Sequence, residues 1–365
     1  MSIASLAPDY VRSIMAYQPG KPISELAREM GIPESSIVKL ASNENPLGMS
    51  PHARDAALAA VSEVARYPDG GAFALKKALC ERLGVRPEQL VVGNGSNDIL
   101  ELVSQAFLAP GLSAIYSRHA FAVYPLATNA RGARGIEVAA KNFGHDLDAM
   151  AAAIEAQTRV IFIANPNNPT GTFLHGAAIE AFLEKVPRHV LVVLDEAYTE
   201  YLAPEQRYDS IAWLARFPNL LVSRTFSKAY GLAGLRVGYG IAHPEVADLM
   251  NRVRQPFNVS SVGLAAAEAA LGDDEFIARS AEINRRGMAQ LTTAFAELGI
   301  EWIPSAGNFV TFKAGDAVGI NQALLRQGVI VRPIAAYGMA HWLRVSIGLP
   351  EENARFIAAL KQALA

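Results

Sequence analysis

The stretch NLLVSRTFSKAYGLAGLR, residues 219–236, joins an apolar run to a polar loop that carries one lysine, Lys228. The run NLLVS (219–223) does not alternate between polar and apolar residues, which is typical of a strand covered on both faces of a parallel sheet. Lys228 then stands between hydroxyl side chains and Arg236. Two interpretations follow, a solvated surface loop or a reactive amine beside an anion site.

Four more short apolar runs share this continuous pattern. They are AIYS (114–117), VIFIA (160–164), VLVVLDE (190–196) and RVGYGIA (236–242). Helical patterns such as GAAIEAFLEKV (176–186) lie between several of them, which predicts an α/β fold with a mostly parallel central sheet flanked by helices. Ligands bind at the carboxyl ends of strands in such sheets, so the residues after each strand are the candidates for a site.

The last third of the chain has a different pattern. Residues 261–297 hold alanine-rich helical patterns, and segments such as GNFVTFKAG (307–315) read as short, alternating strands. We therefore expect a large α/β domain over residues 48–260. A smaller α+β domain would combine residues 1–47, as an N-terminal arm, with residues 261–365.

Composition excludes several classes of protein. The 365 residues are 51% hydrophobic, enough for a large core, and the 33 Lys and Arg residues nearly balance the 35 Asp and Glu residues. A net charge of −2 does not indicate a partner among nucleic acids or membrane surfaces. The single cysteine, Cys80, excludes an internal disulfide and fits a reducing compartment. With neither a membrane span nor a signal-peptide pattern evident, we expect a cytoplasmic protein.

One candidate anion site follows the run LVV (90–92), where a glycine turn leads into a helix that begins at Ser96 or Asn97. Backbone N–H groups at a helix N-terminus bind anions, and small residues let a phosphate approach. The turn is not a dinucleotide fingerprint, because Asp98 stands where the third glycine belongs. An ordinary helix cap remains the alternative.

Two further strands are followed by residues that suit a ligand. NPNNPTG (165–171) predicts an ordered turn, in which Asn168 offers an amide to a ligand oxygen. Asp195 ends a buried apolar run, with Tyr198 three residues later. A buried carboxylate is costly unless it is paired, so Asp195 is either a helix cap or the partner of a buried cation.

Together these residues suit an aromatic, phosphorylated, carbonyl-bearing cofactor with a ring nitrogen, which is pyridoxal 5'-phosphate. Lys228 would form the Schiff base, and Asp195 would keep the pyridine nitrogen protonated. Gly231 and Gly234 would let the loop come close. Hydroxyls and a guanidinium would hold the phosphate, namely Thr225, Ser227 and Arg236.

At this point the motifs NPNNPTG, VLDEAY and SRTFSKAYGLAGLRVGY resemble the signatures of fold-type I pyridoxal-phosphate aminotransferases, in order and in spacing. YQPGKP (17–22), LASNENPLG (40–48) and RYPDG (66–70) are similar to the histidinol-phosphate aminotransferase family. The resemblance covers nearly the whole chain. It implies a homodimer with shared active sites.

The resemblance also implies a role for each cofactor-binding residue. Lys228 would carry the cofactor and then move a proton, and Asp195 would pair with the pyridine nitrogen. Tyr198 and Asn168 would hydrogen-bond the ring hydroxyl oxygen, and Phe121 would stack on the ring, where many members have tyrosine; a core aromatic is the alternative. The phosphate would be bound by Gly95, Ser96, Asn97, Thr225, Ser227 and Arg236, together with Tyr67 of the neighbouring subunit.

On the substrate side, the resemblance places two arginines. Arg344 matches the residue that holds an acidic end of the substrate, and Arg332 matches a second one, unless it is a salt-bridged edge residue. Tyr17 would close over the substrate, and Asn43 would lie nearby. His119 is a candidate neighbour of the site. The seven histidines show no spacing typical of metal ligands.

The implied reaction transfers an amino group from L-histidinol phosphate to 2-oxoglutarate, which gives imidazole acetol phosphate and L-glutamate in histidine biosynthesis. Two enzymes of the same fold are alternatives, an aromatic amino-acid aminotransferase and a threonine-phosphate decarboxylase. A cofactor-binding regulator is a further class, but Lys228, Asp195 and Arg236 are all present and no room for a DNA-binding module is expected. A shared fold does not fix the substrate.

Overall fold

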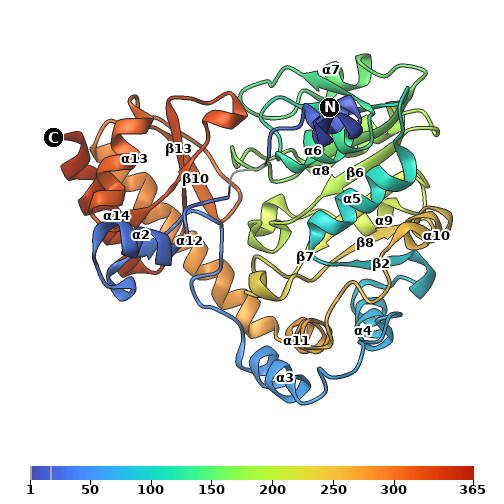
Figure 1. Cartoon of the computed structure of the whole chain (residues 1–365), viewed down its shortest axis with the longest axis horizontal. Coiled ribbons are helices and arrows are strands. Elements are labelled where there is room, and N and C mark those ends of the chain that lie inside the picture. The colour runs from blue at the N-terminus through green and yellow to red at the C-terminus, as the bar shows by residue number, and fades with distance from the viewer. Residues whose placement is uncertain (1, 17–18) are drawn as a thin grey trace.

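The computed structural model describes residues 2–16 and 19–365. Its central feature is a sheet of seven strands, which Figure 1 shows at the heart of the larger part. β8 runs antiparallel to both of its neighbours, and the other strands are parallel. In spatial order the strands are β2 (Leu90–Gly93), β8 (Gly238–Ala242), β7 (Leu220–Thr225), β6 (Leu191–Asp195), β5 (Thr158–Ala164), β3 (Ser113–Ser117) and β4 (Arg134–Val138). The mostly parallel α/β sheet predicted from the sequence is confirmed.

Helices cover both faces of this sheet, which is why its central strands are apolar throughout. One hydrophobic cluster contains side chains of α5 (Ser96–Phe107), α6 (Val123–Ala130) and α10 (Pro244–Val253). The cluster on the opposite face draws on six other helices among the described residues. These are α3 (Pro51–Val61), α4 (Phe73–Leu83), α7 (Leu147–Ala152), α8 (Gly176–Lys185), α9 (Ser210–Trp213) and α11 (Ser261–Leu271).

The smaller part is built on an antiparallel sheet with its own hydrophobic cluster. The strand order is β12 (Arg332–Pro333), β13 (Trp342–Ser346), β10 (Phe309–Lys313) and β9 (Trp302–Ile303). Its helices are α12 (Asp274–Glu297), α13 (Ala317–Arg326) and α14 (Pro350–Leu364). In Figure 1, α12 runs from the neighbourhood of α11 into the smaller part.

The beginning of the chain contacts both parts. β1 (Val38–Lys39) pairs in parallel with β11 (Val329–Ile330), and α2 (Ile23–Met30) lies in the smaller part in Figure 1. The short helix α1 (Asp9–Arg12) instead contacts α6 of the larger part. Residues 2–6, at the start of the described chain, are exposed.

One expected boundary needs correction. Residues 261–271 were expected in the smaller domain, but they form α11, which packs on α3 and α4. The buried alanines Ala266, Ala267 and Ala270 give α11 a flat apolar face against the cluster of the large sheet. Within residues 2–16 and 19–365, no helix is long and apolar enough to cross a membrane.

Candidate active site

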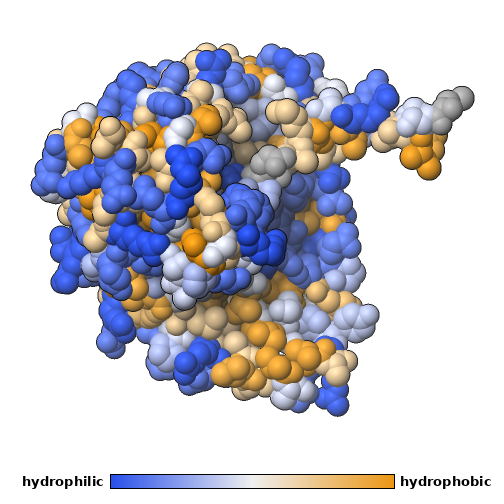
Figure 2. Space-filling view, turned by 60° about the vertical axis from the view of Figure 1, so that its left-hand side comes forward, coloured by the Kyte–Doolittle hydropathy of each residue, from blue (hydrophilic) through white to orange (hydrophobic). Residues whose placement is uncertain are grey.

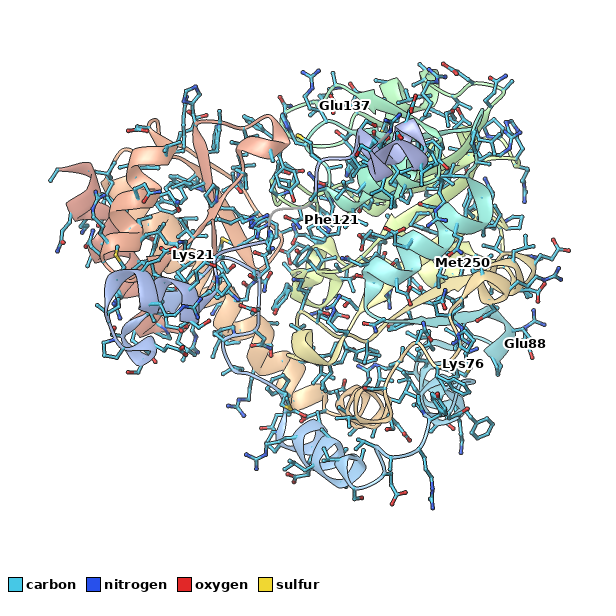
Figure 3. The ribbon with its side chains drawn as sticks, viewed as in Figure 1. Lys21, Lys76, Glu88, Phe121, Glu137 and Met250 are labelled. Atoms are coloured by element: carbon cyan, nitrogen blue, oxygen red, sulfur yellow. The ribbon has the colours of Figure 1, made fainter. Side chains whose placement is uncertain are left out.

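A cavity of about 220 Å³ opens at the carboxyl ends of β5, β6 and β7, and residues of both parts line it. In Figure 3 the labelled Phe121 lies at the boundary between the two parts. The cavity brings together most residues predicted from the sequence, which come from segments far apart in the chain. They are Asn43, Ser96, Asn97, Phe121, Asn168, Asp195, Tyr198, Thr225, Ser227, Lys228, Arg236, Arg332 and Arg344.

Lys228 lies in the loop after β7, and its Nζ donates a hydrogen bond to the backbone oxygen of Ser42 at 3.1 Å. Burial, and next the charge of Arg344, lower the pKa of Lys228 from 10.5 to about 8. At neutral pH a much larger share of this amine is unprotonated than in an exposed lysine. An unprotonated amine is the nucleophile that attacks a carbonyl carbon.

Asp195 ends β6 and is buried, with only 5% of its surface exposed. The hydroxyl of Tyr124 donates to its Oδ2 at 2.9 Å, whereas its Oδ1 is buried without a hydrogen-bond partner among the described residues. Burial raises the pKa of Asp195 to about 6, and the hydrogen bond from Tyr124 opposes that rise. The carboxylate therefore offers one unpartnered oxygen to a cationic donor.

Tyr198 and Asn43 form a hydrogen-bonded pair in the cavity wall. Asn43 Nδ2 donates to the Tyr198 oxygen at 2.9 Å, and Asn43 itself is held by Ser346 and Asn308 of the smaller part. Burial raises the pKa of Tyr198 to about 12, so the phenol keeps its proton at neutral pH. Because its oxygen already accepts from Asn43, the hydroxyl proton is the group that it presents to a ligand.

Arg344 spans the two parts of the molecule. From β13 its Nη1 donates to Oδ1 of Asn168, and its Nη2 donates to the backbone oxygen of Ala41 at 2.7 Å. Accepting through Oδ1 leaves the NH₂ group of Asn168 as the donor toward a ligand. The guanidinium also lies 5.2 Å from the ring centroid of Phe309, which adds a cation–π contact.

An anion cradle forms where α5 begins. The helix starts at Ser96, as predicted, and the N–H groups at its N-terminus favour an anion. Arg236 Nη1 donates to Ser227 Oγ at 3.1 Å, and the backbone N–H of Ser227 donates to Thr225 Oγ1 at 3.1 Å. At Gly95, where φ is +80°, a Cβ would lie only 2.5 Å from Arg236 Nη2, so glycine lets the guanidinium approach.

The loop after Lys228 depends on one of its two glycines. Gly231 has φ +71°, and a Cβ there would lie 1.8 Å from the backbone oxygen of Gly48, so close approach requires glycine as expected. The same expectation for Gly234 is wrong, because a Cβ there would meet nothing within 4 Å. Gly234 faces open space and does not bring the loop closer.

His119 lies beside the site, as expected. Its Nδ1 lies 2.7 Å from the backbone oxygen of Tyr337, which belongs to the smaller part and lines the cavity. Its own backbone oxygen accepts from Asn167 Nδ2 at 2.8 Å. Phe121, two residues later, lines the cavity and meets the Tyr124 ring edge to face at 5.9 Å.

Two of the described residues predicted for the site, Gly95 and Tyr67, are not among those that line this cavity. Tyr67 is 83% exposed and stacks on Phe257, with ring centroids 4.8 Å apart. Tyr17 lies outside the described residues. Among the residues that the structure describes, no three His, Cys, Asp or Glu side chains are grouped so as to hold a metal ion.

The sequence of this chain is similar to those of known proteins. The aminotransferase class I and II family matches residues 35–360. Histidinol-phosphate aminotransferase 1 of Cupriavidus pinatubonensis is 63% identical over 98% of this chain and 96% of its own, and the namesake in Thiobacillus denitrificans is 64% identical over 99% and 94%. The chain belongs to the histidinol-phosphate aminotransferase family, within aminotransferase class I and II.

A solved structure extends the family likeness to three dimensions. The histidinol-phosphate aminotransferase of Sinorhizobium meliloti, determined in complex with pyridoxal-5'-phosphate, superimposes with a TM-score of 0.90 at 28% identity. The match covers 99% of this chain and 98% of that one. The likeness confirms the fold-type I architecture of this aminotransferase.

Several residues at this site were not predicted from the sequence, among them Tyr124, Ser42 and Tyr337. Tyr124 lies in the first turn of α6 (Val123–Ala130), three residues after Phe121, and no motif marks it. Ser42 contributes only a backbone oxygen, which side-chain patterns do not reveal. Tyr337 lies in a short 3₁₀ helix (Ala335–Tyr337) without any motif.

Proposed function

We propose that the chain uses pyridoxal 5'-phosphate to transfer an amino group from L-histidinol phosphate to 2-oxoglutarate. The products would be imidazole acetol phosphate and L-glutamate, in histidine biosynthesis. The observation that carries the proposal is the meeting of Lys228 and Asp195 in one cavity with an anion cradle at the start of α5. Relatives at 60–64% identity named histidinol-phosphate aminotransferase support the substrate.

The residues present fit the cofactor at three points. The cradle of Ser96, Ser227 and Arg236 suits a phosphate dianion, because it combines helix N–H groups with a guanidinium. The unpartnered Oδ1 of Asp195 suits a protonated ring nitrogen. The amine of Lys228 suits the aldehyde carbon.

When bound, pyridoxal 5'-phosphate supplies a carbonyl for the amino group and a ring that withdraws electrons from the substrate. The chain supplies the rest. Lys228 Nζ, with its lowered pKa, accepts and returns a proton near neutral pH. Asp195 keeps a negative charge in a buried place, and Tyr198 and Asn168 offer hydrogen-bond donors to an oxygen on the ring. Phe121 lines the same cavity and offers an aromatic face.

The substrate side of the cavity is cationic. Arg332 and Arg344 both line it, and their forked guanidinium groups match a phosphate or a carboxylate. The same pair therefore suits the phosphate of histidinol phosphate and an acidic end of 2-oxoglutarate. Asn43 would orient Tyr198 from the same side, and Tyr17 would close over the substrate.

We also propose a cytoplasmic homodimer with shared active sites. Several large apolar side chains are exposed on and near α3 and α4, where Figure 2 shows apolar residues gathered at the lower edge of the molecule. They are Leu58, Val61, Val64, Tyr67, Phe73 and Phe257. An exposed apolar patch of this kind marks an interface, and a second copy would cover it. Tyr67 would then reach the phosphate in the partner's cavity.

The test is a single turnover. The purified protein, loaded with pyridoxal 5'-phosphate, is mixed separately with L-histidinol phosphate, L-phenylalanine and L-threonine phosphate, and conversion to pyridoxamine phosphate is followed by absorbance. We expect histidinol phosphate to react far faster than phenylalanine, and Lys228→Ala to abolish the conversion. Preference for phenylalanine would indicate an aromatic aminotransferase. Carbon dioxide release from threonine phosphate, without pyridoxamine phosphate, would contradict both transaminase assignments.

A further inference from the structure

Tyr124 lies directly behind the cavity and is fully buried. Its ring stacks on Phe162 of β5, with centroids 4.8 Å and planes 5° apart, and Phe121 meets it edge to face. These contacts fix the ring, and the hydroxyl donates to Asp195 Oδ2 at 2.9 Å. The hydroxyl thus has a defined direction, toward the carboxylate.

The two oxygens of Asp195 have different surroundings. Oδ2 accepts from Tyr124, whereas Oδ1 is buried and has no partner among the described residues. A buried acceptor without a donor is costly, so Oδ1 suits a ligand that brings a donor. The hydrogen bond at Oδ2 determines how the carboxylate is turned, and therefore where Oδ1 points.

We propose that Tyr124 is a positioning residue, which keeps Asp195 ionised and turned so that Oδ1 meets the protonated ring nitrogen of the cofactor. The inference rests on the proposed function. Tyr124 does not line the cavity and acts only through Asp195.

The groups around Asp195 determine whether removal of the Tyr124 hydroxyl raises or lowers the pKa of Asp195. Burial and the charge of Glu196 oppose the ionised carboxylate, whereas the hydrogen bond from Tyr124, the backbone N–H of Ala197 and the charge of Lys228 favour it. Tyr198 is a further titratable neighbour. Removal of the Tyr124 hydroxyl therefore raises the pKa of Asp195 further above its ordinary value. A larger share of Asp195 is then protonated at a given pH, and a protonated carboxyl group binds the cationic ring nitrogen poorly.

The experiment measures binding of pyridoxamine 5'-phosphate to the cofactor-free protein by calorimetry, between about pH 5.5 and about pH 8. This probe has no carbonyl and forms no bond with Lys228, so affinity reports the non-covalent contacts alone. We expect Tyr124→Phe to bind it about tenfold more weakly, as for loss of a hydrogen bond to a charged group. The pH below which affinity falls should move upward. Tyr116→Phe, a buried tyrosine in the same hydrophobic cluster, should change neither quantity.

The coupling between the two residues is the decisive control. In an Asp195→Asn background, Tyr124→Phe should cause little further loss, because the charge that Tyr124 stabilises is gone. Equal losses in both backgrounds would overturn the inference and leave Tyr124 with a packing role only.

A second variant keeps the inference testable if Tyr124→Phe does not fold. Replacing Tyr124 by 3-fluorotyrosine keeps the ring and the hydroxyl but makes the hydroxyl a stronger donor, so binding should tighten and the fall in affinity should move to lower pH. Unchanged binding would contradict the inference alone. Failure of the wild-type protein to bind pyridoxamine 5'-phosphate would overturn the proposed function together with it.

Discussion

The guanidinium of Arg224 lies 2.8 Å from the carboxylate of Glu196, and the two side chains are only 15% and 1% exposed. Arg224 belongs to β7 and Glu196 follows β6, so the pair joins the ends of the two strands that deliver Lys228 and Asp195. The backbone hydrogen bonding between β6 and β7 continues past the end of β6, because the backbone N–H of Glu196 donates to the Ser223 oxygen.

We expect Arg224→Met to lower the free energy of unfolding by about 3–5 kcal/mol, because it leaves the carboxylate of Glu196 buried without its cation. The matched control is Arg216→Met, which removes two ion pairs of an exposed arginine, with Glu180 and Glu184, and should cost at most about 1 kcal/mol. Urea denaturation followed by tryptophan fluorescence measures both. Similar losses in the two variants would show that burial of the Arg224 pair has no special weight.

The lowered pKa of Lys228 predicts a pH dependence of cofactor uptake. The neutral amine is the reactive form, so the rate at which pyridoxal 5'-phosphate attaches to the cofactor-free protein should fall as the pH drops through about 8. Arg344→Met removes a positive charge that lowers this pKa, and the midpoint should therefore move to higher pH. Stopped-flow absorbance measures the rate, and an unmoved midpoint in the variant would contradict the electrostatic explanation.

Gly231 and Gly234 form a matched pair within one loop. Gly231→Ala places a methyl group against the Gly48 oxygen at a positive φ, and we expect a loss of at least about 2 kcal/mol in stability, together with weaker cofactor retention. Gly234→Ala meets open space and should leave both unchanged. Thermal unfolding measures the stability of each variant, and cofactor absorbance measures how much cofactor each variant retains. Equal tolerance at the two positions would rule out close approach at Gly231.

The hydrogen bond between His119 and the Tyr337 backbone joins the larger part to the substrate side of the cavity. Loss of one neutral hydrogen bond, worth about 1 kcal/mol, corresponds to about a fivefold effect. We therefore expect His119→Ala to raise KM for histidinol phosphate by that factor, with kcat nearly unchanged. His119→Asn retains an N–H at the position of Nδ1 and should restore KM. A loss of kcat that asparagine does not rescue would indicate a different role.

Shared active sites can be tested by mixing subunits. Tyr67→Ala and Lys228→Ala should each impair their own homodimers, but a hybrid dimer would keep one site with both residues intact. Random mixing of equal amounts should restore about a quarter of the sites in a twofold-symmetric dimer. The mixture is unfolded and refolded together before assay. Activity no greater than the sum of the separate variants would exclude a role for Tyr67 in the partner's cavity.

Much of the sheet could be predicted because continuous apolar runs identify strands that are covered on both faces, as β5 and β6 are. Polar residues at the ends of such strands, Asp195 at the end of β6 and Lys228 after β7, could be proposed for the same reason, since strand ends meet at one edge. β4 was missed because this edge strand, RGIEV, is only partly buried and contains two charged residues. Its pattern differs from that of the central strands.

The missed contacts of the site share a different cause. Tyr124 and Asp195 are 71 positions apart, and Lys228 and Ser42 are 186 apart. Local patterns determine which face of an element a residue occupies, but they carry no information on which distant element packs against it. Contacts of this kind become visible only when tertiary packing is known.

The link between Asn43 and Ser346 has a consequence for how the protein is made. The ribosome synthesises Ser346 303 residues after Asn43, which takes roughly 15–60 s at the usual speed of synthesis. The larger sheet is complete well before that, since its last strand ends at Ala242. The wall of the cavity that contains Asn43 and Arg344 is therefore assembled after the large sheet, and a nascent chain acquires a closed binding site only once Ser346 has been translated.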